Sequence, residues 1–251
     1  MRLASIIIGL ALLLAPGAPS AEEKPYRVSL IGDSFDGRAW MTGLLIELDP
    51  GWKTYWRMPG ESGVPPEFTW QSSVPAEIAV RFPAPARYAD ASGETVGYEG
   101  EALFPVVVDA GAAREVELTL DLFFAVCKDI CIPATARAST VLGSVMRDPA
   151  GSARVEEAMR RVPAPGSAVT GAEIGLDGGK PVLRLRLAES VEDIFVETAG
   201  SAYFRKPVFF PDLEASLAID NLKDTSKLSG ATLRITYLLD GQAREQTLTL
   251  P

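Results

Sequence analysis

Short stretches of alternating apolar and polar residues, separated by turn residues, run through most of the sequence. Every second residue is apolar over 44–48 and over 116–122, which is the period of a strand with one buried face. Clusters of glycine and proline, such as Met58–Pro66, separate these stretches. Short strands at fairly regular spacing predict an antiparallel β-sandwich.

The pattern divides the chain into two β blocks joined by a helix. Asp148 followed by Pro149 is a typical helix start, and apolar residues at helical spacing follow. Strand patterns resume at about Val169, and Asp240–Gly241 indicates a hairpin near the end. We therefore expect an all-β fold with a first domain at 22–147, a helical linker at 148–168 and a second β-sandwich domain at 169–251.

The first 21 residues have the features of a secretory signal peptide. Arg2 precedes the apolar run Leu3–Ala15, and the small residues of Pro16–Ala21 offer a cleavage point after Ser20 or Ala21. A retained anchor is the alternative, but the run is short for a membrane span. We expect a soluble, exported protein that meets oxidants.

Two counts exclude whole classes of function. The sequence has no histidine, so Ser-His-Asp and Cys-His catalysis, imidazole-bound zinc and C-x-x-C-H haem attachment are all excluded. The net charge of −9 argues against binding nucleic acid through phosphates. Redox or soft-metal chemistry must therefore use Cys127 and Cys131, the two cysteines of the chain.

The two cysteines flank a predicted reversal of the chain. Strand-like segments at 117–126 and 132–140 leave three residues between the cysteines, so the two thiols face each other. The pair could be a stabilising disulfide, two buried free thiols or a redox-active disulfide. So small a ring cannot tie two sheets together, and free thiols are rare in an oxidising compartment. Redox exchange is the interpretation we favour.

The surroundings of the pair indicate a partner with a better-activated thiol. No helix signal follows Cys131, so the usual source of a low thiol pKa is missing, and the charges of Lys128 and Asp129 partly cancel. Exchange would then depend on docking through exposed apolar residues. The candidates, some of which must pack in the core, are Phe123, Phe124, Ile130 and Ile132.

Two motifs together resemble a known family. Gly51–Trp56 followed by Pro59–Gly63, together with the later Val126–Pro133, is similar to the DsbD N-terminal domains, in the ScsB-like branch linked to copper tolerance. That branch carries two β-sandwich blocks in tandem. The resemblance implies that the protein is periplasmic, that its domains are immunoglobulin-like and that the first block holds a redox-active disulfide.

The resemblance also implies roles and partners. Electrons would pass from a membrane thiol transporter of the DsbD or CcdA type to periplasmic thioredoxin-fold proteins, such as disulfide isomerases or factors of cytochrome c biogenesis. Cys131 matches the cysteine that forms the mixed disulfide, and Cys127 matches the resolving one. The chain would be a protein-disulfide reductase-type electron carrier with no cofactor besides this pair. A cap at Gly93–Gly100 is expected, with the cap or site neighbours Glu94, Tyr98, Tyr55 and Phe124.

The sequence differs from the family in two ways, and two alternative functions stay open. Better-known members separate their cysteines by more residues, and this sequence lacks their transmembrane segments, so it would need a separately encoded membrane donor. Two thiolates with Met41 or Met58 could instead hold Cu(I). A structural or adhesion β-sandwich with an inert disulfide is the other alternative.

In the second block, Tyr203–Pro211 could be a partner-binding edge, although buried sheet aromatics are expected.

Overall fold

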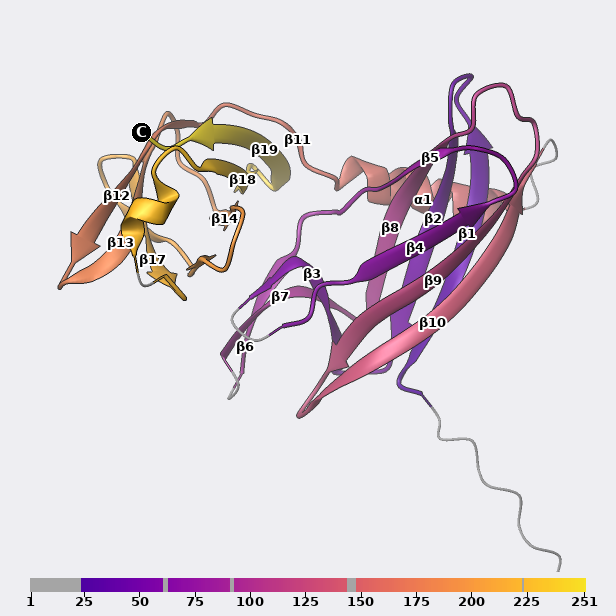
Figure 1. The fold of residues 1–251 in the computed structure, drawn as a ribbon, viewed down its shortest axis with the longest axis horizontal. Coiled ribbons are helices and arrows are strands. Elements are labelled where there is room, and N and C mark those ends of the chain that lie inside the picture. The colour runs from indigo at the N-terminus through magenta and orange to yellow at the C-terminus, as the bar shows by residue number, and fades with distance from the viewer. Residues whose placement is uncertain (1–23, 61–62, 91–92, 144–147, 223) are drawn as a thin grey trace, which may run out of the picture.

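The computed structural model describes residues 24–60, 63–90, 93–143, 148–222 and 224–251. The expected signal peptide lies outside these residues. The described residues form two β-sandwiches that follow each other along the chain (Figure 1). This confirms the predicted all-β fold of tandem immunoglobulin-like sandwiches joined by a short helix.

The first sandwich packs a four-stranded sheet against a six-stranded sheet. The smaller sheet has, in spatial order, β1 (Tyr26–Phe35), β2 (Trp40–Leu48), β8 (Glu101–Asp109) and β5 (Glu77–Val80). The larger sheet has, in spatial order, β10 (Cys131–Leu142), β9 (Val116–Cys127), β3 (Lys53–Gly60), β7 (Gly93–Glu99) and β6 (Ala86–Asp90), with β4 (Glu67–Ser72) paired to β9. The alternating residues predicted to face inward, such as Leu44 and Leu120, fill the core between the sheets.

The helix α1 (Pro149–Arg160) begins where the sequence predicts. The Asp148 carboxylate accepts a hydrogen bond from a backbone N–H of the first turn and caps the helix. The helix joins the two sandwiches in sequence, and it also packs on the first one. Val155 contacts Leu45 and Leu103 on the outer face of the smaller sheet. In the described part of the chain, no helix is long and apolar enough to cross a membrane.

The second sandwich also has two sheets. One contains β11 (Ala164–Pro165), β19 (Gln242–Thr249), β18 (Thr232–Leu239) and β14 (Asp193–Glu197). The other contains β12 (Val169–Asp177), β13 (Lys180–Leu187), β17 (Glu214–Asp220) and β15 (Tyr203–Phe204), with β16 (Val208–Phe210) paired to β17. A short 3₁₀ helix (Thr225–Leu228) precedes β18. The β11–β19 pair is parallel, and the predicted Asp240–Gly241 turn joins β18 to β19 with both residues at positive φ.

The aromatic run at Tyr203–Pro211 is divided between core and surface. Tyr203 and Phe204 are buried, as expected of sheet aromatics. Phe209 and Phe210 are exposed, so that expectation is wrong for them. They lie on a three-residue strand at the edge of the sheet, which has too little partner surface to cover both of its faces.

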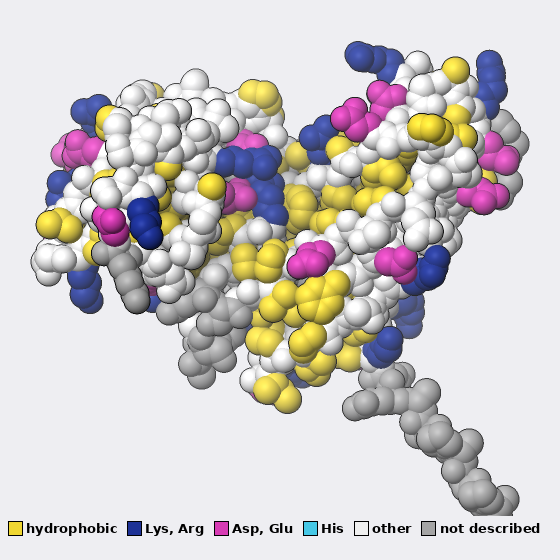
Figure 2. Space-filling model, viewed as in Figure 1, with side chains coloured by type: hydrophobic (Ala, Val, Ile, Leu, Met, Phe, Trp, Pro, Cys, Tyr) yellow, Lys and Arg dark blue, Asp and Glu magenta, His cyan; other side chains and the backbone are white. Residues whose placement is uncertain are grey.

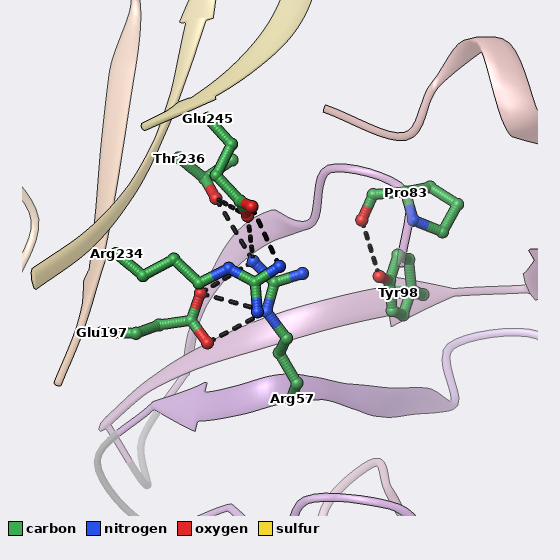
Figure 3. A network of polar contacts seen from close by, with 7 residues as sticks. All are labelled: Arg57, Pro83, Tyr98, Glu197, Arg234, Thr236 and Glu245. Carbon is green, nitrogen blue, oxygen red and sulfur yellow. Dashed lines mark hydrogen bonds and ion pairs between the residues drawn. The ribbon is translucent and has the colours of Figure 1, made fainter. Parts of the chain in front are cut away.

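A network of charges joins the two sandwiches (Figure 3). Arg57 of β3 forms ion pairs with Glu197 of β14 (2.8 Å) and Glu245 of β19 (2.6 Å), and Glu245 also pairs with Arg234 (2.9 Å). Burial by itself would raise the pKa of Glu245. The hydrogen bonds and charges of Arg234 and Arg57 outweigh burial, so the pKa lies below its ordinary value of 4.5.

Because Glu245 has a lower pKa in the docked structure than in water, its contribution to docking is present above pH 4.5 and is lost as the pH falls through the lowered pKa. We expect the two sandwiches to stay docked near neutral pH and to loosen as the pH falls below 4.5 and through the lowered pKa. Small-angle X-ray scattering would detect this as a larger radius of gyration. The variant Glu245→Gln should show a smaller pH response. A response of full size in that variant would contradict the assignment to Glu245.

Candidate functional site

Cys127 and Cys131 form a disulfide at the tip of the β9–β10 hairpin. Cys127 is the last residue of β9 and Cys131 the first of β10, and the register places them directly opposite each other with Cα atoms 4.1 Å apart. The predicted strands and the three-residue reversal between them are confirmed. The tip projects from one end of the first sandwich (Figure 1).

The two cysteines differ in their exposure to solvent. Cys127 is buried, with 5% of its surface exposed, in a small cluster with Tyr55, Ala125 and Val64. Cys131 is exposed at the start of β10. A thiolate on another protein can therefore approach Cys131 and not Cys127, because an attacking sulfur needs a free path to its target.

Tyr55 of β3 lies beside the disulfide. Its hydroxyl oxygen is 3.0 Å from Cys131 Sγ, and because a bonded sulfur carries no hydrogen, the hydroxyl is the donor. β3 is fixed here by the pairing of Lys53 with Cys127 and by a hydrogen bond of 2.9 Å from Thr54 Oγ1 to the Ala125 carbonyl. The Tyr55 hydroxyl is therefore held where it can stabilise a thiolate on Cys131.

The charged residues of the reversal differ in their contacts. The Lys128 ammonium donates to the Pro50 carbonyl at 3.3 Å, and its side chain lies over Gly51 in the turn before β3. Asp129 is exposed. Lys128 therefore ties the cysteine hairpin to the neighbouring turn.

Apolar side chains are exposed on the hairpin that carries the cysteines. Ile130, in the reversal itself, is 72% exposed, and Phe123 and Ile132 are also exposed. Figure 2 shows hydrophobic side chains gathered over this end of the first sandwich. Of the two adjacent phenylalanines, Phe124 is the one that packs in the core, as alternation along a strand requires, and its ring meets Tyr26 edge-on. The exposed set is therefore Phe123, Ile130 and Ile132, called here the docking residues.

The structure does not bring Glu94 and Tyr98 to the sulfurs. Both lie on β7, within the segment 93–100 that was expected to form a cap. Glu94 pairs with Arg87 and accepts a hydrogen bond from Tyr203 of the second sandwich, at 2.6 Å in each case. The Tyr98 hydroxyl donates to the Pro83 carbonyl at 2.8 Å (Figure 3), and burial raises the pKa of this hydroxyl well above its ordinary value. The segment is a sheet strand because its backbone pairs with β3 and β6.

The two methionines considered as copper ligands lie in other clusters. Met41 packs beside Val155 under helix α1, and Met58 packs beside Trp56 and Phe195. In the ranges that the structure describes, no group of three or more acidic, cysteine or histidine side chains is placed to hold a metal ion. Neither methionine shares the cluster that contains Cys127.

Two neighbours of the site have no sequence signal. Val64 covers one side of Cys127 from the segment after β3, and Thr54 bonds across the sheet to Ala125. A valine in a proline-rich turn and a threonine in a strand are common in any β protein. Only the fold shows that they line the sulfur site.

Comparison with known proteins agrees with this site. Residues 23–143 match the family described as the N-terminal part of thiol:disulfide interchange protein DsbD. The first sandwich is therefore DsbD N-terminal-like. The fold of the chain as a whole is ScsB-like: the crystal structure of the N-terminal periplasmic domain of ScsB from Proteus mirabilis covers 90% of this chain, and this chain covers 91% of that one, with a TM-score of 0.67 and 22% identity. No curated protein sequence matches the chain.

Proposed function

We propose that the protein is a periplasmic electron carrier that exchanges thiols for disulfides through Cys127 and Cys131. The observation that carries this proposal is a disulfide between an exposed cysteine, Cys131, and a buried one, Cys127, at a projecting hairpin tip. The DsbD family match over residues 23–143 supports it. The periplasmic location of the similar ScsB domain supports the compartment.

The exchange proceeds in two displacements. A thiolate of a reduced donor attacks Cys131 Sγ, the bond between the two cysteines breaks, and Cys127 leaves as a thiolate that takes up a proton. A second donor thiol then attacks the mixed disulfide, which releases the Cys131 thiolate and leaves the donor oxidised. Two electrons have moved to this protein. The reverse sequence, with Cys131 attacking and Cys127 resolving, passes them to an acceptor disulfide.

Partners follow from this chemistry. The family implies a membrane donor of the DsbD or CcdA type and thioredoxin-fold acceptors in the periplasm. The docking residues Phe123, Ile130 and Ile132 would contact the partner around the sulfurs, because an apolar rim excludes water and aligns the three sulfurs.

Equilibration with glutathione tests the proposed function. The oxidised protein is incubated over a range of ratios of reduced to oxidised glutathione, its thiols are alkylated, and the mass of each species is measured. A reversible transition between the disulfide and the dithiol is expected. A disulfide that stays intact in millimolar dithiothreitol would show a structural bridge and would end the proposal.

Replacing Tyr55 by phenylalanine is expected to make Cys131 less reactive. The hydroxyl donates a hydrogen bond to Cys131 Sγ, and a bond of this kind, worth about 1 kcal/mol, would stabilise the thiolate about fivefold. Its removal should raise the pKa of the thiol and slow alkylation at neutral pH by the same factor. The pH profile of iodoacetamide labelling in a Cys127→Ser background measures this. An identical profile with and without the hydroxyl would rule out the role given to Tyr55.

A further inference from the structure

Two arginines of the first sandwich reach into the second. Arg57 of β3 holds the two glutamates described above. Arg87 of β6 bonds to the Asp193 carboxylate at 3.0 Å and to the Ile194 carbonyl at 2.7 Å, and it pairs with Glu94 of β7 at 2.6 Å. All these charged side chains are largely buried. Because buried charges must keep their partners, each arginine fixes its strand to the second sandwich.

An aromatic contact lies between the two arginines. Trp56 is fully buried and meets Phe195 of β14 edge-on, with ring centroids 5.7 Å apart. The Arg57 guanidinium lies 4.2 Å from the Trp56 ring centroid, and that of Arg87 lies 4.4 Å from the Phe195 centroid. Aromatic packing as well as ion pairs therefore holds the two sandwiches together.

The connector between the sandwiches is hydrogen-bonded to both. The Arg161 carbonyl, just after α1, accepts from the Ala84 N–H of the first sandwich at 3.0 Å. The Gly166 N–H donates to the Glu245 carbonyl of the second at 2.9 Å. These bonds restrict relative movement of the two sandwiches in addition to the side-chain contacts.

The strand that carries this contact also carries Tyr55. β3 keeps a regular register with β7 as far as the pair Tyr55–Gly97, and the register is then lost until Gly60. The next two residues, Trp56 and Arg57, are those held by the second sandwich. Tyr55 thus lies between a sheet ladder on one side and the interdomain contact on the other.

We propose that Arg57 is a positioning residue for disulfide exchange: its two ion pairs anchor β3 to the second sandwich and so hold the Tyr55 hydroxyl against Cys131 Sγ. The inference rests on the proposed function. It gives the second sandwich a part in the chemistry although it contributes no cysteine. If the anchor is released, Tyr55 loses its fixed distance to the sulfur, and the Cys131 thiolate loses a hydrogen bond.

The test replaces two glutamates of the second sandwich and measures the reactivity of Cys131 in the first. In the full chain with Cys127→Ser, Glu197→Gln and Glu245→Gln are combined, and the pH profile of Cys131 alkylation is recorded. We expect the profile to move to higher pH and the rate at neutral pH to fall about threefold. The matched control Glu101→Gln removes an exposed pair with Arg154 elsewhere on the surface and should change nothing.

A mutant cycle separates positioning from general loosening. In a Tyr55→Phe background, the two glutamate changes should have no further effect, because the hydroxyl that they position is gone. An unchanged profile in the glutamate variant, or an equal effect in both backgrounds, would overturn the inference. The failure of the proposed function would look different: the wild-type disulfide would then resist glutathione, whatever these variants do.

Discussion

Replacing Cys127 by serine is expected to leave the protein covalently attached to its partners, and replacing Cys131 is not. The chain has two cysteines, so each variant keeps a single thiol. Cys131 is exposed among the docking residues, and without Cys127 nothing within the chain can resolve a mixed disulfide on it. Cys127 is 5% exposed, and reactivity requires access. The variant that keeps only Cys127 should therefore form about tenfold less mixed disulfide with partners.

The amount of mixed disulfide that each variant forms is measured in two ways. In vitro, each variant is incubated with oxidised glutathione, and the adduct is quantified by its mass. In cells, mixed disulfides are separated without reductant and the attached proteins are identified by mass spectrometry. Thioredoxin-fold proteins and a membrane thiol transporter are the expected partners. Equal trapping by both variants would contradict the roles given to the two sulfurs.

Replacing Gly97 by alanine is expected to cause the largest loss of stability near the site. Gly97 of β7 lies opposite Tyr55, and a Cβ there would overlap the Thr54 carbonyl oxygen and lie 3.0 Å from the Tyr55 Cα. Both are backbone atoms of β3, so β3 and β7 must separate. We expect a loss of about 3 kcal/mol in the free energy of unfolding, at the upper end for an overpacked interior.

Urea unfolding monitored by circular dichroism measures this loss. Gly143→Ala is the matched control, since the nearest atom to its added Cβ is Glu115 Oε2 at 4.0 Å. It should leave stability nearly unchanged. Because β3 moves in the Gly97 variant, Cys131 alkylation should slow as it does in Tyr55→Phe. A variant at Gly97 as stable as the control would show that β3 and β7 are less tightly packed than described.

Much of the fold could be predicted because its causes are local. Alternation along 116–122 defined β9, Asp148 defined the helix start, and Asp240–Gly241 defined a hairpin turn. Each of these signals depends on a few neighbouring residues. The position of α1 on the outer face of the smaller sheet could not be predicted, because the apolar stripe of a helix does not show which surface will cover it.

The site was predictable where residues close in sequence stay close in space. Cys127 and Cys131 are four residues apart, and their position on a hairpin follows from the strands on either side. Alternation predicts that one of Phe123 and Phe124 packs in the core, and the fold shows that it is Phe124. The pairs Arg57–Glu197 and Glu94–Tyr203 join residues more than a hundred positions apart, and no spacing rule connects them.

The shortness of the disulfide loop means that reduction need not unfold the molecule. The bond closes a ring of only a few residues, so its loss removes about 2 kcal/mol of chain-entropy stabilisation. The strands on either side pair over their full length through backbone hydrogen bonds, which do not involve the sulfurs. The oxidised and reduced forms can therefore share one scaffold, so under the proposed function the same molecule would be reduced and oxidised repeatedly without refolding.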